Sequence, residues 1–155
     1  MAIIVRVQAE DFDAGAEIAR LRAGHPEVGA IATFVGIVRD RNGGTDGVAT
    51  LTLEHYPGMT ERSLEAICAD ACARWPLVDV TVVHRIGTMR PTDQIVFVAA
   101  SSAHRGAAFD ATAFLMDYLK TEAPFWKKEA TDTGERWVEA RASDDAARER
   151  WSTGA

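Results

Sequence analysis

Alternating apolar and polar positions, together with frequent β-branched residues, predict five strands in the first two thirds of the chain. These strands cover residues 2–8, 29–40, 48–56, 78–86 and 94–102. The segment 40–47 between the second and third strands is rich in glycine and polar side chains, which predicts a loop. A turn that carries Gly87 and Pro91 separates the last two strands.

Apolar residues that recur every three to four positions predict three helices. The helices cover residues 13–23, 61–75 and 106–122. Gly24 ends the first helix, and Pro76 and Pro124 follow the other two, because proline does not continue a helix. Thr60 is expected to cap the second helix. The core-facing stripe of that helix comprises Leu64, Ile67, Cys68, Ala71 and Trp75.

The last third of the chain predicts a hairpin and a charged end. Residues 125–130 and 135–142 form its strands around the turn 132–134, and the last dozen residues form a short helix or a tail. Strands and helices are mixed without strict alternation, which predicts an α+β fold. The length of 155 residues fits one domain, which we place at 1–142, with 143–155 as the charged end.

Composition narrows the classes of function. The net charge of −6 disfavours nucleic-acid binding, which normally needs a basic face. No apolar run approaches the roughly 20 residues of a membrane span, and the first residues lack the features of a secretory signal. We therefore expect a cytoplasmic protein that does not bind membranes.

Two cysteines, Cys68 and Cys72, are four positions apart on the second predicted helix. Zinc sites need further His, Cys or carboxylate ligands, and no such cluster is present near these thiols in the sequence. We therefore expect no metal and interpret both cysteines as small core residues.

All three lysines lie within nine residues, at 120, 127 and 128, whereas the other fourteen basic residues are arginine. Arginine stays protonated at any working pH, but the pKa of a lysine falls when it is buried. The cluster therefore suggests a place where a lysine amine is required. Chance clustering on a solvated surface is the alternative, and spacing alone does not decide between them.

Lys120 extends an apolar face of the third predicted helix, which also carries Phe109, Thr112, Ala113 and Met116. Its amine either snorkels to water or points into a cleft where partial burial tunes its pKa. Lys127 and Lys128 follow on a predicted strand, so their side chains should point to opposite faces. At most one of them can then share a pocket with Lys120.

Cationic side chains also follow predicted strands. Arg39 opens the glycine-rich loop, and His104 and Arg105 stand where a strand gives way to a helix start. Backbone N–H groups at a helix start favour anions, and both side chains add donors suited to phosphate. An ordinary salt bridge for Arg39 and backbone bonding for His104 are the alternatives. His55 and His84 have weaker contexts, and we interpret them as structural.

Several longer words resemble the molybdopterin synthase catalytic (large) subunit family. They are GAIATFVGIVR, LTLEHYPGMTE, RWPL followed by VTVVHRIG, DQIVFVAASSAHR, and MDYLKTEAPFWKKE followed by RWVEA, within residues 28–141. The resemblance implies an α/β-hammerhead-like fold with a mostly antiparallel sheet and two long helices. It also implies an enzyme without a cofactor, which converts cyclic pyranopterin monophosphate (precursor Z) to molybdopterin.

The same resemblance implies protein partners. Sulfur comes from a small ubiquitin-like carrier subunit whose C-terminal Gly-Gly carries a thiocarboxylate. The large subunit forms a central homodimer, with one carrier at each end of the heterotetramer. A partner-supplied thiocarboxylate makes a persulfide on Cys68 or Cys72 unnecessary.

The resemblance assigns roles to seven residues. Lys120 and Lys127 match the catalytic pair. The expected substrate contacts are Arg39, His104, Arg105, Lys128 and Glu129. Ile37 stands at a position where some relatives have a polar or basic residue. The loop 40–47 varies in the family, so the resemblance implies no role for it. Two other readings are a non-catalytic anion-binding or carrier-docking module of the same fold, and a partner-independent hydrolase of cyclic phosphates.

Overall fold

The computed structural model describes residues 2–40, 48–131, 134–138 and 142–152. Most of the predicted loop 40–47, the centre of the hairpin turn at 132–133 and the segment 139–141 lie outside the described residues.

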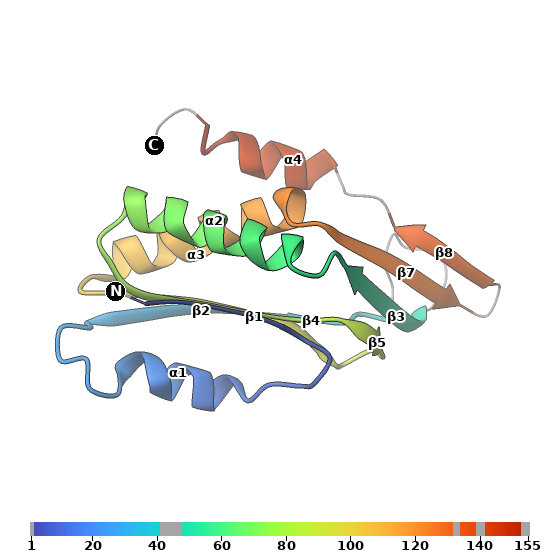
Figure 1. The fold of residues 1–155 in the computed structure, drawn as a ribbon, viewed down its shortest axis with the longest axis horizontal. Helices are drawn as coiled ribbons and strands as arrows, with labels where there is room; N and C mark the ends of the chain where they lie inside the picture. The colour runs from blue at the N-terminus through green and yellow to red at the C-terminus, as the bar shows by residue number, and fades with distance from the viewer. Residues whose placement is uncertain (1, 41–47, 132–133, 139–141, 153–155) are drawn as a thin grey trace.

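The first sheet has the strand order β1-β4-β6-β2. Its strands are β1 (Ala2–Gln8), β4 (Leu77–Arg85), β6 (Gln94–Ser102) and β2 (Ala30–Ile37). β1 pairs with β4 in parallel, whereas β4–β6 and β6–β2 are antiparallel. The two central strands are buried over most of their length because helices cover both faces of the sheet (Figure 1).

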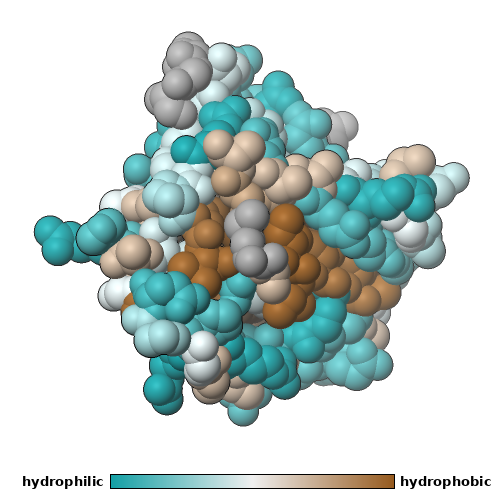
Figure 2. All heavy atoms as spheres, turned by 60° about the vertical axis from the view of Figure 1, so that its left-hand side comes forward, coloured by the Kyte–Doolittle hydropathy of each residue, from teal (hydrophilic) through white to brown (hydrophobic). Residues whose placement is uncertain are grey.

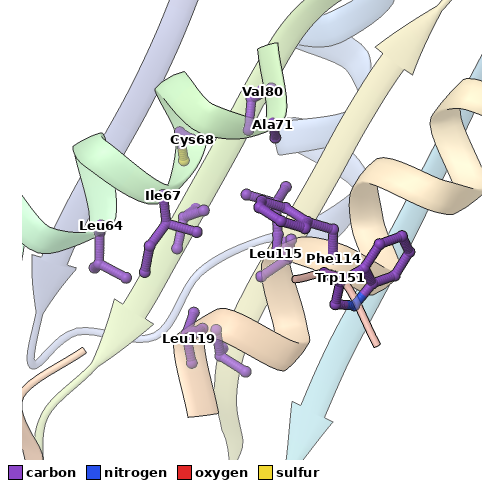
Figure 3. Close-up of a cluster of buried hydrophobic side chains, with 12 residues drawn as sticks. Leu64, Ile67, Cys68, Ala71, Val80, Phe114, Leu115, Leu119 and Trp151 are labelled. Carbon is purple, nitrogen blue, oxygen red and sulfur yellow. The ribbon is translucent and has the colours of Figure 1, made fainter. Parts of the chain in front are cut away.

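Two long helices, α2 (Met59–Arg74) and α3 (Arg105–Glu122), lie on one face of this sheet, and α1 (Ala14–Arg22) lies on the other (Figure 1). The main core forms between the long helices and the sheet. Figure 3 shows Leu64, Ile67, Cys68 and Ala71 of α2 directed toward Phe114, Leu115 and Leu119 of α3. The helix α4 (Ala142–Glu149) follows, and Trp151 after it is buried in the same cluster.

The second sheet lies beyond the end of the first and has the order β5-β3-β7-β8 (Figure 1). Its strands are β5 (Gly87–Met89), β3 (Val48–His55), β7 (Phe125–Thr131) and β8 (Gly134–Val138), and all of its pairs are antiparallel. Val38, Leu51, Leu53 and Met89 form the small core under this sheet. The prediction of a mixed α+β fold with two long helices and mostly antiparallel pairing is confirmed.

The predicted cap of α2 is wrong. Gly58 occupies the cap position with φ +82°, a conformation that favours glycine, and its N–H donates to the Glu61 carboxylate at 3.2 Å. Thr60 lies inside the helix and is fully buried. Its hydroxyl accepts a hydrogen bond from the Tyr56 N–H and donates one to the Pro124 carbonyl, each at 3.0 Å. Thr60 therefore ties the start of α2 to the segment that leads into β7.

Apolar side chains also reach the surface. Figure 2 shows one face on which hydrophobic residues form a band framed by hydrophilic ones. Over the described residues, the exposed large apolar side chains include Ile3, Ile4, Phe34, Ile37 and Trp126. Exposed apolar area of this kind is a feature of interaction surfaces. None of the helices among the described residues has the length and apolar character needed to cross a membrane.

Candidate active site

Lys120 lies in the last turn of α3 and is exposed. On the apolar face that Lys120 extends, Thr112 is buried, whereas Phe109 is 64% exposed. The buried face of α3 instead comprises Ala108, Ala111, Thr112, Phe114, Leu115 and Leu119. The helix dipole favours a cation at this end of α3. Lys120 thus stands on the flank of the helix, with its ammonium accessible to a substrate.

Lys127 and Lys128 project from opposite faces of β7, as predicted. Lys127 lies directly across from the buried Leu53 and is half-buried, on the face that looks toward the small core. Lys128 lies across from Thr52 on the outer face. There its ammonium is 3.6 Å from a carboxylate oxygen of Glu135 and 5.6 Å from the ring centre of Trp137. Of the two lysines on β7, only Lys127 therefore lies on the inner face, where it can share a pocket with Lys120.

Glu129 belongs to the same inner face as Lys127. It lies across from the buried Leu51 and is 1% exposed, which makes it the most buried carboxylate among the described residues. The expected binding segment 127–129 is therefore divided by the pleat of the strand. Lys127 and Glu129 point inward, and Lys128 points outward.

Arg39 lies at the same end of the first sheet as the lysines. It follows β2, whose last residue, Ile37, pairs with the first residue of β6, Gln94. The neighbouring Val38 fixes this segment through backbone bonds with Asp93 and Thr92, both at 2.9 Å. α3 begins after the far end of β6 and runs back along the sheet, so its last turn returns to this end (Figure 1). Arg39 and Ile37 are both exposed here.

His84 also lies at this end of the fold, although its sequence context predicted only a structural role. It is the penultimate residue of β4, is 5% exposed and stacks on Phe125 with ring centres 3.8 Å apart. Burial, with smaller contributions from the positive charges of Lys120 and Lys127, lowers the pKa of His84 to about 3, against a raising hydrogen bond to the Arg85 carbonyl. Its imidazole is therefore neutral at physiological pH and electrostatically coupled to both lysines.

We name the set Arg39, His84, Lys120 and Lys127 the lysine end. The residues next to His84 in the sequence do not indicate that it belongs to the lysine end. Its contact with Phe125 joins β4 of the first sheet to β7 of the second.

His104 and Arg105 lie at the opposite end of α3. His104 occupies the cap position without a side-chain capping bond, and Arg105 is the first helical residue. Both are exposed. Lys120 is sixteen positions after His104, which at 1.5 Å per residue is about 24 Å along the helix. One chain therefore does not bring the predicted phosphate contacts His104 and Arg105 together with the lysines.

The cysteines lie away from the lysine end. Cys68 is 0% exposed within the main core, and Cys72 packs partly buried against the same cluster. Burial, with smaller contributions from Cys72 and Glu65, raises the pKa of the Cys68 thiol to about 12. Burial also raises the pKa of Cys72. Neither thiol is predisposed to ionise, because a nucleophilic cysteine needs a lowered pKa.

The fold and the lysine end thus define a mixed α and β domain that carries two amines and an arginine at the end of the first sheet that adjoins the second sheet. Residues 7–122 match the family model described as MoaE protein. The chain therefore belongs to the MoaE family.

Relatives and solved structures are similar to this chain over most of its length. The molybdopterin synthase catalytic subunit of Ralstonia nicotianae is 60% identical over 147 residues, which cover 95% of this chain and 83% of the relative. The solved molybdopterin biosynthesis MoaE protein of Burkholderia ambifaria is 58% identical with a TM-score of 0.83, over 98% of this chain and 99% of that one. Molybdopterin synthase from Staphylococcus aureus, at 29% identity, superposes with a TM-score of 0.80 over 86% of this chain and 96% of that one.

Proposed function

We propose that the chain is the catalytic, sulfur-transferring subunit of a cytoplasmic molybdopterin synthase. The observation that carries the proposal is the meeting of Lys120 and Lys127 at one end of the fold, in a chain 60% identical to a subunit of that name. The substrate is precursor Z, and the sulfur donor is the C-terminal thiocarboxylate of a small ubiquitin-like carrier. The product is the dithiolene of molybdopterin.

We assign different tasks to the two amines. The thiocarboxylate sulfur attacks an electrophilic carbon of the pterin side chain, and an oxygen leaves. Water then hydrolyses the thioester that joins carrier and pterin, which leaves the sulfur on the pterin and releases the carrier as a carboxylate. Lys120, exposed at the helix end, donates the proton that the leaving oxygen takes up. Lys127, half-buried on the inner face of β7, holds the thiocarboxylate or the phosphate by its charge. Glu129 on the same face and Arg39 at the adjoining strand end complete the binding groups around this centre.

The length of α3 decides how His104 and Arg105 take part. A phosphate bound about 24 Å from the amines lies too far away for one small substrate to reach both. We therefore assign His104 and Arg105 of each chain to the site of a second copy in the central homodimer. A two-fold axis places the same pair of residues in each of the two sites. Lys128, on the outer face, serves binding at the periphery.

The experiment is reconstitution from purified parts. The chain, precursor Z and a thiocarboxylated carrier are combined, and dithiolene formation is followed. The expected result is two sulfurs transferred per precursor, with no product when the carrier carries an ordinary carboxylate. Turnover of precursor Z without carrier would instead support a stand-alone hydrolase. Binding of the carrier without any sulfur transfer would support a docking module.

A further inference from the structure

A short connection joins the two elements that carry the amines. Between the end of α3 and the start of β7 lie two residues, Ala123 and Pro124. Lys120 is four positions before Pro124, and Lys127 is three positions after it. The backbone torsions of this connection therefore set where the two amines lie relative to each other.

A buried hydroxyl group binds this connection from another part of the chain. The Thr60 hydroxyl donates a hydrogen bond to the Pro124 carbonyl and accepts one from the Tyr56 N–H, each at 3.0 Å. Thr60 is 0% exposed, so its hydroxyl bonds to these protein groups rather than to water. It belongs to the first turn of α2, which begins on the side of the molecule where α3 ends (Figure 1).

The bond from Thr60 acts on the torsion that proline leaves free. The ring of Pro124 fixes φ, so ψ is the soft torsion of that residue. Rotation about ψ turns the Pro124 carbonyl and swings the chain that follows it. On the far side of this carbonyl, the Phe125 N–H donates to the Ala123 carbonyl at 2.9 Å, and the Phe125 ring stacks on His84. The carbonyl that Thr60 holds thus controls the direction in which β7 leaves α3.

The same hydroxyl relates this direction to the neighbouring strand. Tyr56 directly follows β3, and β3 pairs with β7 from His55 across from Phe125 to Leu53 across from Lys127. Without the hydroxyl, the Tyr56 N–H and the Pro124 carbonyl would both lose their partner, which is costly for groups that are shielded from water. The connection would then turn to satisfy them, and β7 would turn with it.

We propose that Thr60 is a positioning residue, whose hydroxyl fixes ψ at Pro124 and thereby holds Lys127 in register with Lys120. This inference rests on the proposed function, because the sulfur-transfer step uses the two amines together. Thr60 is buried and acts only through these amines. A misplacement of reacting groups by about 1 Å can lower a rate by about a hundredfold, so a small turn of the connection has a large effect.

Substitutions of Thr60 separate its hydroxyl from its shape. Thr60→Val removes the hydroxyl and keeps the branched shape, Thr60→Ser keeps the hydroxyl, and Thr60→Cys supplies a weaker donor. The matched control is Thr112→Val, which removes another buried hydroxyl of α3 that donates to the Ala32 carbonyl at 3.1 Å.

The kinetic arm measures single-turnover dithiolene formation with thiocarboxylated carrier at saturating precursor Z, per folded chain. The rate should fall about tenfold or more in Thr60→Val and stay within about threefold of wild type in Thr60→Ser and in the Thr112→Val control. Thr60→Cys should lie between Ser and Val, and it replaces Val in the comparison if Val does not fold. Equal losses in Thr60→Val and Thr112→Val would contradict a positioning role.

The structural arm needs no turnover. The chain contains three lysines, so labelling with 13C-lysine gives three Cε signals by NMR. The signals of Lys120 and Lys127 should move relative to wild type in Thr60→Val. In Thr60→Ser and Thr112→Val they should stay near their wild-type positions. Signals that do not move in Thr60→Val would overturn the inference.

The two arms also separate this inference from the proposed function. Near-normal turnover in Lys120→Arg and Lys127→Arg would remove the proposed roles of the amines, while the lysine signals would still show whether Thr60 holds the connection. Lost turnover in those two variants, together with a normal rate in Thr60→Val, would leave the function standing and remove the role of Thr60.

Discussion

The two ends of α3 carry different chemistry. The C-terminal end carries Lys120, at the end of the fold that also holds the neutral, buried His84 and the half-buried Lys127. The N-terminal end presents His104 and Arg105, both exposed, at the start of the helix, where backbone N–H groups favour anions. The first end is suited to proton transfer and the second to phosphate. One helix keeps them about 24 Å apart, so a site that needs both must draw them from two chains.

The largest effect is expected at the lysine end. Lys120→Arg and Lys127→Arg keep the charge but replace an amine that can give up its proton with a guanidinium that does not. Loss of general acid catalysis at Lys120 should lower single-turnover dithiolene formation by about a hundredfold or more. Lys128→Arg, from the outer face of the same strand, should stay within about twofold. Near-normal rates in Lys120→Arg and Lys127→Arg would leave only a requirement for charge.

A smaller and different effect is expected at the other end of α3. Arg105→Ala removes a charged donor to the phosphate but none of the reacting groups, so KM for precursor Z should rise about tenfold while kcat changes little. The side chain is exposed, so the free energy of unfolding should change by less than about 0.5 kcal/mol. Steady-state kinetics and urea denaturation measure the two. If Arg105→Ala lowered kcat as much as Lys120→Arg does, the two ends of α3 would not have different roles.

Acid should destabilise the fold through His84. Its pKa is about 3 in the folded chain against the ordinary histidine value of 6.5, so the unfolded chain binds the proton more readily and stability falls as pH drops below about 6.5. The slope approaches roughly 1.4 kcal/mol per pH unit between pH 6 and 4. Urea denaturation should show a flatter slope in His84→Phe. The window from pH 4.5 to 6.5 avoids Asp11, whose lowered pKa makes its contribution disappear only at more acidic pH.

The smallest effect on activity is expected in the core. Cys68→Ala should cost about 1–2 kcal/mol of unfolding free energy by leaving a small cavity, and Cys72→Ala should cost less because it is only partly buried. Sulfur transfer by both folded variants should match wild type. Iodoacetamide should modify Cys72 before Cys68, because Cys68 is fully buried and the pKa of its thiol is about 12. Loss of sulfur transfer in a folded variant would return a cysteine to the mechanism.

Much of the fold follows from local sequence patterns. The strand at 94–102 and the start of the strand at 2–8 match β6 and β1, because alternation and β-branching are local properties. The three-residue strand β5 was missed, since its identity comes from pairing with β3 rather than from its own residues. The cap of α2 was placed two residues late because the positive φ of Gly58 depends on how the chain enters the helix.

The site was predictable in part. The rarity of lysine singled out the three lysines from the sequence alone. The two-residue period of a strand then placed Lys127 and Lys128 on opposite faces. The expected substrate contacts His104 and Arg105 do not lie near the lysines within a single chain, because α3 separates them along its length. His84 could not be found from its own neighbours, since its ring is held by Phe125, forty-one positions later in the chain.

Subunit mixing tests the division between the two ends of α3 most directly. Lys120→Ala chains and chains with both His104→Ala and Arg105→Ala are prepared separately, then unfolded together and refolded with thiocarboxylated carrier. Each variant alone should be nearly inactive at precursor Z concentrations below the wild-type KM. Random mixing should recover about a quarter of wild-type activity, because half of the dimers then contain one intact site. Activity no higher than the average of the separate variants would show that each chain completes its own site, and would contradict the account.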